Sequence, residues 1–305
     1  MFVIKNRAAA LLVIFLIYIL AAFCGIHSYN YFAAENGLAL SYPFAIFFAD
    51  VVATVVVFIF SLIFGNASVY DPYWSVQPPV ILIALASSQF SSFKELLSFL
   101  GVENGVFRIN WFSFDFMIIA AVLFWAIRLT ANWIYNFKSF EYQDWRYVML
   151  KEKSGHFYGF INFMGIHLFP TCVVFLCVLP AATAIVENVQ LTPLSYVFIM
   201  LSFAAVIFQG IADVQMHQFR NSGAGGFIRT GLWKHARHPN YACEILMWWG
   251  VGLASVTALG GKYWLLAGAL INSLMFIFVS VPLADQRQSR KPGFEEYKKE
   301  TRMFI

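Results

Sequence analysis

The residues best suited to chemistry gather between Gly231 and Leu253, where a polar cluster runs directly into an apolar segment of membrane-crossing length. Arg237 and His238 precede Pro239, which lacks an N–H and therefore fits the first turn of a helix. The free N–H groups of that turn, beside two basic side chains, predict an anion site at the mouth of a membrane helix. Glu244 follows inside the apolar stretch, where an ionisable group is costly and usually functional.

Polar side chains recur at three- and four-residue spacing in two other segments, which places them on one face of each helix. They are Arg128, Asn132 and Tyr135, then Gln209, Asp213, Met216, His217 and Arg220, with Asp144, Arg146 and Tyr147 in a loop between the two segments. Arginine offers a planar fork to phosphate, and Asn and Asp bind amide or ribose hydroxyl groups. The pattern predicts a site for a dinucleotide phosphate. Individual basic residues are also consistent with topology anchors, and Glu244 or Asp213 with a buried pair to Arg237 or Arg220.

The composition is that of a membrane protein, because 60% of the 305 residues are hydrophobic and only 12% are charged. Runs of about 20 apolar residues can cross the roughly 30 Å of hydrocarbon in a bilayer. Eight such runs lie near residues 8–24, 43–64, 79–99, 112–135, 157–180, 194–212, 241–258 and 262–282, of which the third and seventh are the weakest. We predict an all-α polytopic membrane protein with seven or eight transmembrane helices, forming a single integral membrane domain over residues 1–305.

The distribution of Lys and Arg predicts the orientation, because cytoplasmic loops concentrate these residues. With eight spans and both termini in the cytoplasm, sixteen of the twenty fall inside; Lys94, Arg108 and Lys262 fall outside, and Arg128 lies within a span. The formal charge of +4 then reflects topology and an anionic ligand, and nothing indicates nucleic acid. The six histidines are too scattered for a di-iron site, so we predict no metal. The oligomeric state is left open.

Four sequence blocks carry a resemblance to a known family. They are GLWKHARHPNY at residues 231–241, SVYDPYWSVQPP at 68–79, RLTANW at 128–133 and QDWRY at 143–147. The chain resembles bacterial steroid 5α-reductase-like membrane reductases, a branch described as a domain of unknown function. That branch is related to sterol reductases and, more distantly, to isoprenylcysteine carboxyl methyltransferases.

The resemblance implies an NADPH-dependent oxidoreductase of the bacterial inner membrane. It would reduce a C=C bond conjugated to a carbonyl in a lipophilic, possibly steroid-like substrate that reaches it through the lipid bilayer. Helices within residues 1–135 would mainly form the substrate cavity, and residues 136–305 would mainly form a cytoplasm-facing cofactor pocket. Spacing and resemblance together give the expected cofactor-binding residues as Arg128, Asn132, Asp144, Arg146, Asp213, His217, Arg220, Arg237, His238, Asn240, Tyr241, Glu244, Arg287 and Arg290.

The catalytic half of the site departs from the family pattern. In the steroid enzymes a Glu and a Tyr polarise the carbonyl, whereas this chain has Asp-Pro-Tyr-Trp-Ser in the first region and Trp125 near the second. We therefore expect Asp71 and Tyr73 to be catalytic and the pocket to be lined by Trp74, Ser75, Gln77 and Trp125. Asp-Pro-Tyr is equally typical of a helix cap. An S-adenosylmethionine-dependent methyltransferase and a non-catalytic lipid-binding protein are the alternative functions.

Overall fold

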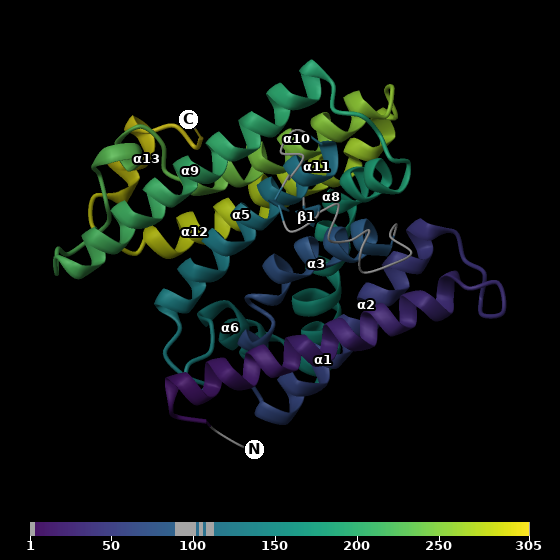
Figure 1. Cartoon of the computed structure of the whole chain (residues 1–305). Coiled ribbons are helices and arrows are strands. Elements are labelled where there is room, and N and C mark those ends of the chain that lie inside the picture. Colours follow the sequence, from purple (N-terminus) through teal and green to yellow (C-terminus); the bar gives the residue numbers. More distant parts are fainter. Residues whose placement is uncertain (1–3, 89–101, 104–105, 108–112, 305) are drawn as a thin grey trace.

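The computed structural model of the chain describes residues 4–88, 102–103, 106–107 and 113–304, and these are almost entirely helical (Figure 1). The α-helices are α1 (Arg7–Ala33), α2 (Tyr42–Phe64), α3 (Tyr73–Ser88), α5 (Phe114–Asn136), α6 (Trp145–Ser154), α7 (Tyr158–Ile161), α8 (Phe169–Val186), α9 (Pro193–Asn221), α10 (Pro239–Ala258), α11 (Ala267–Met275), α12 (Val281–Gln288) and α13 (Phe294–Glu300). Two-residue strands β1 (Val102–Glu103) and β2 (Val106–Phe107) pair antiparallel.

Shorter helical turns connect or extend these helices. They are the 3₁₀ turns η1 (Ala67–Val69), η2 (Gly155–Phe157), η4 (Gly231–Lys234) and η5 (Tyr263–Leu266), and the π-helical segments η3 (Asn162–Leu168) and η6 (Phe276–Ser280). The π-helical segments leave no break, so α7 continues into α8 and η5 into α12, whereas Gly155 (φ 50°, ψ −120°) ends α6 before this helix; the two helical stretches cover 145–186 and 263–288. Such π segments inside longer helices are frequent at functional sites.

The structure confirms a helical polytopic membrane protein. Within the described residues, six helical stretches are long and apolar enough to cross a membrane: Arg7–Ala33, Tyr42–Phe64, Phe114–Asn136, Trp145–Val186, Pro193–Asn221 and Tyr263–Gln288. The two weakest predicted spans correspond to α3 and α10, which pack within the same bundle. The third predicted span, 79–99, runs partly outside the described residues, as do Lys94 and Arg108. The count of seven or eight spans therefore stays a prediction.

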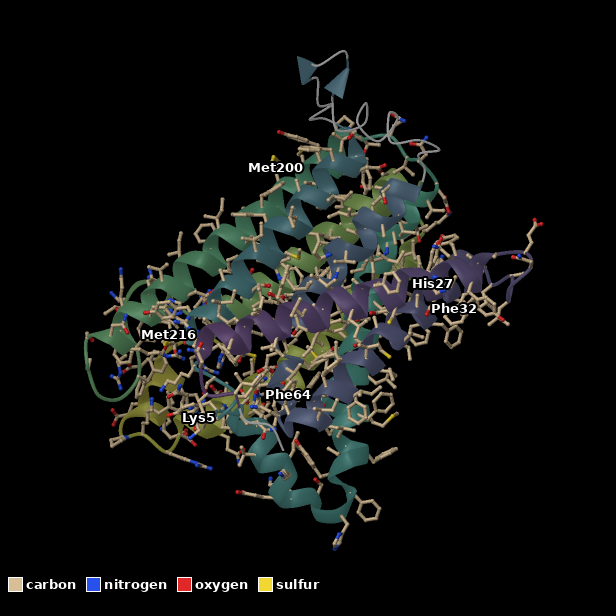
Figure 2. All side chains as sticks on the ribbon, turned by 60° about the horizontal axis from the view of Figure 1, so that its bottom comes forward. Lys5, His27, Phe32, Phe64, Met200 and Met216 are labelled. Carbon is tan, nitrogen blue, oxygen red and sulfur yellow. The ribbon has the colours of Figure 1, made fainter. Side chains whose placement is uncertain are left out.

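The helices run roughly parallel or antiparallel to a common axis, and their charged ends meet on one side. In Figure 1 the start of α1, the end of α9, and α6, α12 and α13 all lie toward the left. Figure 2 shows Lys5 and Met216 toward this end and His27 and Phe32 toward the other. We call this side, which carries Lys5, Arg146, Arg220 and Arg287, the charged end. Its assignment to the cytoplasm stays a prediction.

Local sequence explains how the site helices begin. Helix α9 starts with a capping box, in which the Thr192 side chain accepts from the Ser195 N–H while Ser195 Oγ accepts from the Thr192 N–H. Pro193 follows at the position where a missing N–H costs nothing. Helix α5 is capped by the Ser113 hydroxyl, which accepts from the Phe116 N–H. These caps fix where α5 and α9 begin.

Candidate functional site

The polar stripes predicted on α5 and α9 face each other. Hydrogen bonds join the two helices at successive turns: Asn136 Oδ1 accepts from Arg220 Nη1 at 3.1 Å, Asn132 Oδ1 lies 2.8 Å from His217 Nε2, and Asp213 Oδ2 accepts from Arg128 Nη1 at 2.7 Å. We call this arrangement the α5–α9 ladder. It leads from the charged end into the interior, and at 1.5 Å per residue its span from residue 136 to residue 128 is roughly 12 Å. The ladder thus carries polar side chains over three successive helical turns.

At the inner end of the ladder lies a buried carboxylate. Glu244 on α10 is 4% exposed and accepts from Trp125 Nε1 at 2.9 Å, Gln209 Nε2 at 2.6 Å and Trp248 Nε1 at 3.1 Å. Arg128 Nη2 lies 3.5 Å from the same carboxylate. Three N–H donors and a guanidinium thus offset the cost of burying this charge. We call these five residues the Glu244 cluster.

Arg128 pairs with both Asp213 and Glu244. The sequence had instead predicted ion pairs of these residues with Arg237 or Arg220. The reason is depth. Residues 128, 213 and 244 lie at the same depth on three adjacent helices, whereas Arg220 and Arg237 lie nearer the charged end. A guanidinium between two carboxylates is well stabilised in an apolar interior.

The Glu244 cluster retains unused hydrogen-bonding capacity. Arg128 Nε and Nη2 and Gln209 Oε1 are buried and have no hydrogen-bond partner among the described residues. Buried polar atoms are normally paired, so this combination of donors and an acceptor is suited to a ligand. A carboxamide has both a carbonyl oxygen and an N–H₂ group and would satisfy both kinds of atom. The nicotinamide end of a dinucleotide carries this group, so the residues present fit it.

Cationic side chains gather where the ladder meets the charged end. Arg220 and Arg287 both act electrostatically on Lys291, whose pKa is lowered first by burial and then by these two charges. The guanidinium of Arg287 also lies 5.0 Å from the ring centre of Trp145 at the start of α6. Arg290 is exposed two residues before Pro292. Arg287 and Lys291 belong to the segment after η6, and Arg220 ends α9, so two distant parts of the chain supply one basic mouth.

Arg146 belongs to the same region but is already paired. It donates from Nε to Asp144 Oδ1 at 2.8 Å, and the Asp144 side chain also caps α6 by accepting from the Arg146 N–H. Both residues also act electrostatically on Tyr241 at the start of α10. Four of the predicted cofactor residues, Asp144, Arg146, Tyr241 and Arg287, therefore come together at the mouth from three separate helices.

Arg237 and His238 hold the C-terminal segment. Arg237 Nη1 donates to the carbonyls of Lys298 and Thr301 at 3.1 and 2.6 Å, and its Nε lies 3.6 Å from Asp285 Oδ2. His238 Nε2 lies 2.9 Å from the other oxygen of Asp285. Burial lowers the pKa of His238, while Asp285 acts in the opposite direction. The basic pair of the motif is thus engaged with the protein itself.

Two neighbours complete the start of α10. The Asn240 carbonyl accepts from Gln209 Nε2 at 3.3 Å, which ties the helix to the Glu244 cluster. The Tyr241 ring stacks on His238 with ring centres 5.3 Å apart. Of these four predicted cofactor residues, Tyr241 faces the mouth, Asn240 contributes its main chain, and Arg237 and His238 position the C-terminal segment.

A second buried carboxylate, which sequence reasoning missed, lies in the N-terminal half. Asp50 on α2 is 5% exposed; it accepts from the Tyr73 hydroxyl at 3.3 Å on one oxygen and from the Gln77 amide on the other. Gln77 Oε1 has no partner among the described residues. The signal was present, because Asp50 is the one charged residue in the apolar run 43–64.

The two residues predicted to be catalytic have different surroundings. Tyr73 faces Asp50, whereas Asp71 accepts from the Tyr147 hydroxyl at 2.5 Å and lies near Arg146 at the mouth. Burial raises the pKa of Asp71 to about 6, and the charge of Arg146 limits the rise. The structure therefore places Asp71 and Tyr73 in two polar groups, although only Pro72 separates them in sequence.

Aromatic rings connect the Asp50 region to the Glu244 cluster. The ring centres of Trp74 and Trp125 are 5.8 Å apart, and those of Trp125 and Trp248 are 4.9 Å apart, both in edge contacts. Ser75, another predicted pocket residue, bonds to Thr130 Oγ1 at 2.9 Å and ties α3 to α5. Trp74 is the half-buried member of this row.

The comparison with protein families agrees with this picture. The family described as "Protein of unknown function (DUF1295)" matches residues 57–301. The chain belongs to this family. It is a steroid 5α-reductase-like membrane family. No curated protein and no solved structure matches the chain.

The DUF1295 match covers some parts of the site and leaves out one. It includes the α5–α9 ladder, the Glu244 cluster, and the segments that carry Asp71 and Tyr73. It begins within α2, after Asp50, so this carboxylate lies outside the matched residues. The ladder and the mouth thus lie within the matched residues. Asp50 lies before them, but its partners Tyr73 and Gln77 on α3 lie within them.

Proposed function

We propose that this protein reduces a C=C bond conjugated to a carbonyl in a lipophilic substrate, using NADPH. The observation that carries the proposal is the continuous polar path from a basic mouth, along the α5–α9 ladder, to a buried cluster with unpaired donor and acceptor atoms. Such a path matches a dinucleotide phosphate in order: phosphates at the mouth, ribose hydroxyls along the ladder, and a carboxamide at the inner end. NADPH would supply the hydride.

The residues would divide the work of binding by depth. Arg220, Arg287 and Lys291 would bind phosphate, because clustered cations in a partly buried mouth favour a polyanion. Asn132 and His217 would bind ribose hydroxyls, and Arg128 with Gln209 would orient the carboxamide. The extra 2′-phosphate of NADPH over NADH would be recognised at the mouth.

The substrate half of the site would use Asp50 and Tyr73. A carboxylic acid kept neutral by apolar surroundings can donate to a carbonyl oxygen, and a tyrosine hydroxyl can do the same. Both groups would stabilise negative charge on the carbonyl oxygen as it develops during reduction. Trp74 and Trp125 offer flat apolar surfaces between this pair and Glu244. A planar, hydrophobic enone such as a steroid-like ketone would suit that space. The charged end would face the cytoplasm of a bacterium, where NADPH is present.

The first experiment is a binding titration of detergent-purified protein with NADPH, NADH and S-adenosylmethionine. We expect NADPH to bind most tightly. Arg287→Ala should weaken NADPH binding by roughly 10-fold or more, because a charge-assisted hydrogen bond contributes roughly 1.5–3 kcal/mol. Lys262→Ala is the matched control, since Lys262 is an exposed cation that pairs with Glu187 on the opposite end. Equal effects of the two variants would contradict the assignment of the mouth.

Activity is tested next by NADPH oxidation with a 3-keto-4-ene steroid and with a linear enone as probes. Asp50→Asn should lower turnover while leaving NADPH affinity unchanged. Binding of S-adenosylmethionine instead of NADPH would favour the methyltransferase function. Binding of neither would favour a lipid-binding protein without catalysis.

A further inference from the structure

A chain of buried hydroxyl groups leads away from Asp50. The Tyr73 hydroxyl donates to Asp50 at 3.3 Å and also interacts with the Thr54 side chain, which follows Asp50 by one turn of α2. Thr54 Oγ1 lies 3.0 Å from Thr171 Oγ1, which lies 2.8 Å from the Tyr70 hydroxyl. The hydroxyls come from α2, α3, α8 and the turn after η1, so tertiary packing has assembled them.

Several features distinguish this row of hydroxyl groups from buried hydroxyls that simply bond to their own helix. Both threonines are fully buried, and Tyr70 is 1% exposed. A buried hydroxyl can satisfy itself locally by bonding to the carbonyl one turn earlier, as Thr183 does with Leu179 in the same helix α8. Thr171 instead bonds to two side chains of other elements. Each member is a hydroxyl, a group that can both donate and accept, which is the requirement for passing a proton from one oxygen to the next.

The row of hydroxyl groups runs from Asp50 toward the charged end. Thr54 lies one helical turn from Asp50 in the direction of the charged end, because α2 ends there. Tyr70, the outer member, packs on the His167 ring at 4.8 Å and directly precedes Asp71. The Asp71 carboxyl is half-buried, bonds to Tyr147 and lies beside the mouth. A titratable group thus stands at each end of the row of hydroxyls.

We propose that Tyr73, Thr54, Thr171 and Tyr70 form a proton path that reprotonates Asp50 from the charged end. This inference rests on the proposed function for its biological meaning, since reduction of an enone consumes one proton. Hydride adds to the β-carbon, the C=C π electrons move to the carbonyl oxygen, and that oxygen takes the proton of Asp50. The resulting enol becomes the saturated ketone by moving that proton to the α-carbon. Asp50, left as a carboxylate, then takes a proton from Tyr73, and each hydroxyl in turn takes one from the next, ending at solvent. The protein is unchanged after one turnover.

Thr171 is the residue to change, because it is the only link between Thr54 and Tyr70 in the bonds described. Thr171→Val keeps the shape and removes the hydroxyl, whereas Thr171→Ser keeps the hydroxyl. Thr183→Val is the matched control on the same helix, since Thr183 bonds to its own helix and to Tyr42. Infrared spectra recorded after transfer into D₂O measure exchange of the Asp50 carboxyl proton, identified as the C=O band that Asp50→Asn removes. This measurement needs neither cofactor nor substrate.

We expect the Asp50 band to exchange at least 10-fold more slowly in Thr171→Val than in wild type, and at the wild-type rate in Thr171→Ser and Thr183→Val. Equal exchange in all variants would overturn the path, as would a spectrum in which Asp50→Asn removes no band, because Asp50 would then hold no proton to replace. Turnover with NADPH and an enone separates the two proposals. If wild type turns over an enone with NADPH but the Asp50 band exchanges at the wild-type rate in Thr171→Val, the path alone is refuted. If the Asp50 band exchanges more slowly in Thr171→Val but wild type shows no turnover, the path is supported and the proposed reduction is refuted.

Discussion

Replacing Glu244 by Gln tests whether the inner end of the site is built around a charged carboxylate. The side chain accepts three hydrogen bonds, from Trp125, Gln209 and Trp248, and faces Arg128. A hydrogen bond to a charged group contributes roughly 1.5–3 kcal/mol and a neutral one roughly 0.5–1.5 kcal/mol. Neutralisation should therefore cost about 1 kcal/mol for each bond. The new N–H₂ group must also face one of the donors, which leaves a buried donor unsatisfied at roughly 1–3 kcal/mol.

We accordingly expect Glu244→Gln to lower the free energy of unfolding by about 4 kcal/mol. This agrees with the roughly 3–5 kcal/mol that follows from removing one partner of a buried ion pair. The assay is equilibrium unfolding in mixed SDS and detergent micelles. Glu187→Gln is the control, because the same change in the exposed pair with Lys262 should cost at most about 1 kcal/mol. A loss below about 1 kcal/mol for Glu244→Gln would refute the reasoning, since the side chain would then already act as a neutral group.

Further predictions concern the C-terminal segment, pH and helix packing. Arg237→Ala should free residues after Tyr297, because two carbonyl bonds and an ion contact are lost; faster carboxypeptidase trimming of otherwise folded protein measures this, and unchanged trimming would contradict it. Burial raises the pKa of Asp71 in the folded protein to about 6, above its ordinary value of 3.8, so its neutral form is favoured by folding. Its contribution to stability is present below about pH 4 and is lost as the pH rises to about 6. The melting temperature of wild type relative to Asp71→Asn should therefore fall over that range, and a rise would show the opposite shift. Gly268→Ala should destabilise by roughly 1–3 kcal/mol, because the added methyl meets the main chain of Leu176 where α11 crosses α8; an unchanged melting temperature would contradict that close approach.

Helical spacing was enough to predict the two faces that form the α5–α9 ladder. The polar residues repeat every three or four positions, and in an apolar helix such a stripe has to face other protein. The sequence could not show which stripe faces which. That information lies in the packing, where Arg128 meets both Asp213 and Glu244. The spacing of residues along one helix does not say how that helix is rotated against its neighbour. The sequence therefore could not show whether Asp213 and Glu244 pair with Arg237, Arg220 or Arg128.

The role of the Arg-His-Pro-Asn segment, residues 237–240, depends on contacts with residues that are distant in sequence. Nothing near Arg237 indicates that its guanidinium reaches Thr301, 64 residues later. The basic residues next to a helix start predicted an anion site, whereas in the structure Arg237 contacts main-chain carbonyls of the C-terminal segment and Asp285. The segment is held as a short parallel bridge between Ala236 and Arg302. Cofactor binding at the mouth and order at the C-terminus are therefore expected to be coupled.

The two aspartates of the N-terminal half are suited to different tasks because of their positions. In the proposed reaction a lipophilic ketone would enter from the bilayer and place its carbonyl among apolar helices, where Asp50, Tyr73 and Trp74 lie. Asp71 is bonded to Tyr147 beside Arg146, in a polar layer that such a substrate has no reason to enter. A carboxyl that releases its proton near pH 6 at this boundary is better placed to exchange protons with water. Under the proposed function, the short Asp-Pro-Tyr sequence would join the aqueous side to the substrate side, with Tyr73 acting on the carbonyl and Asp71 at the mouth.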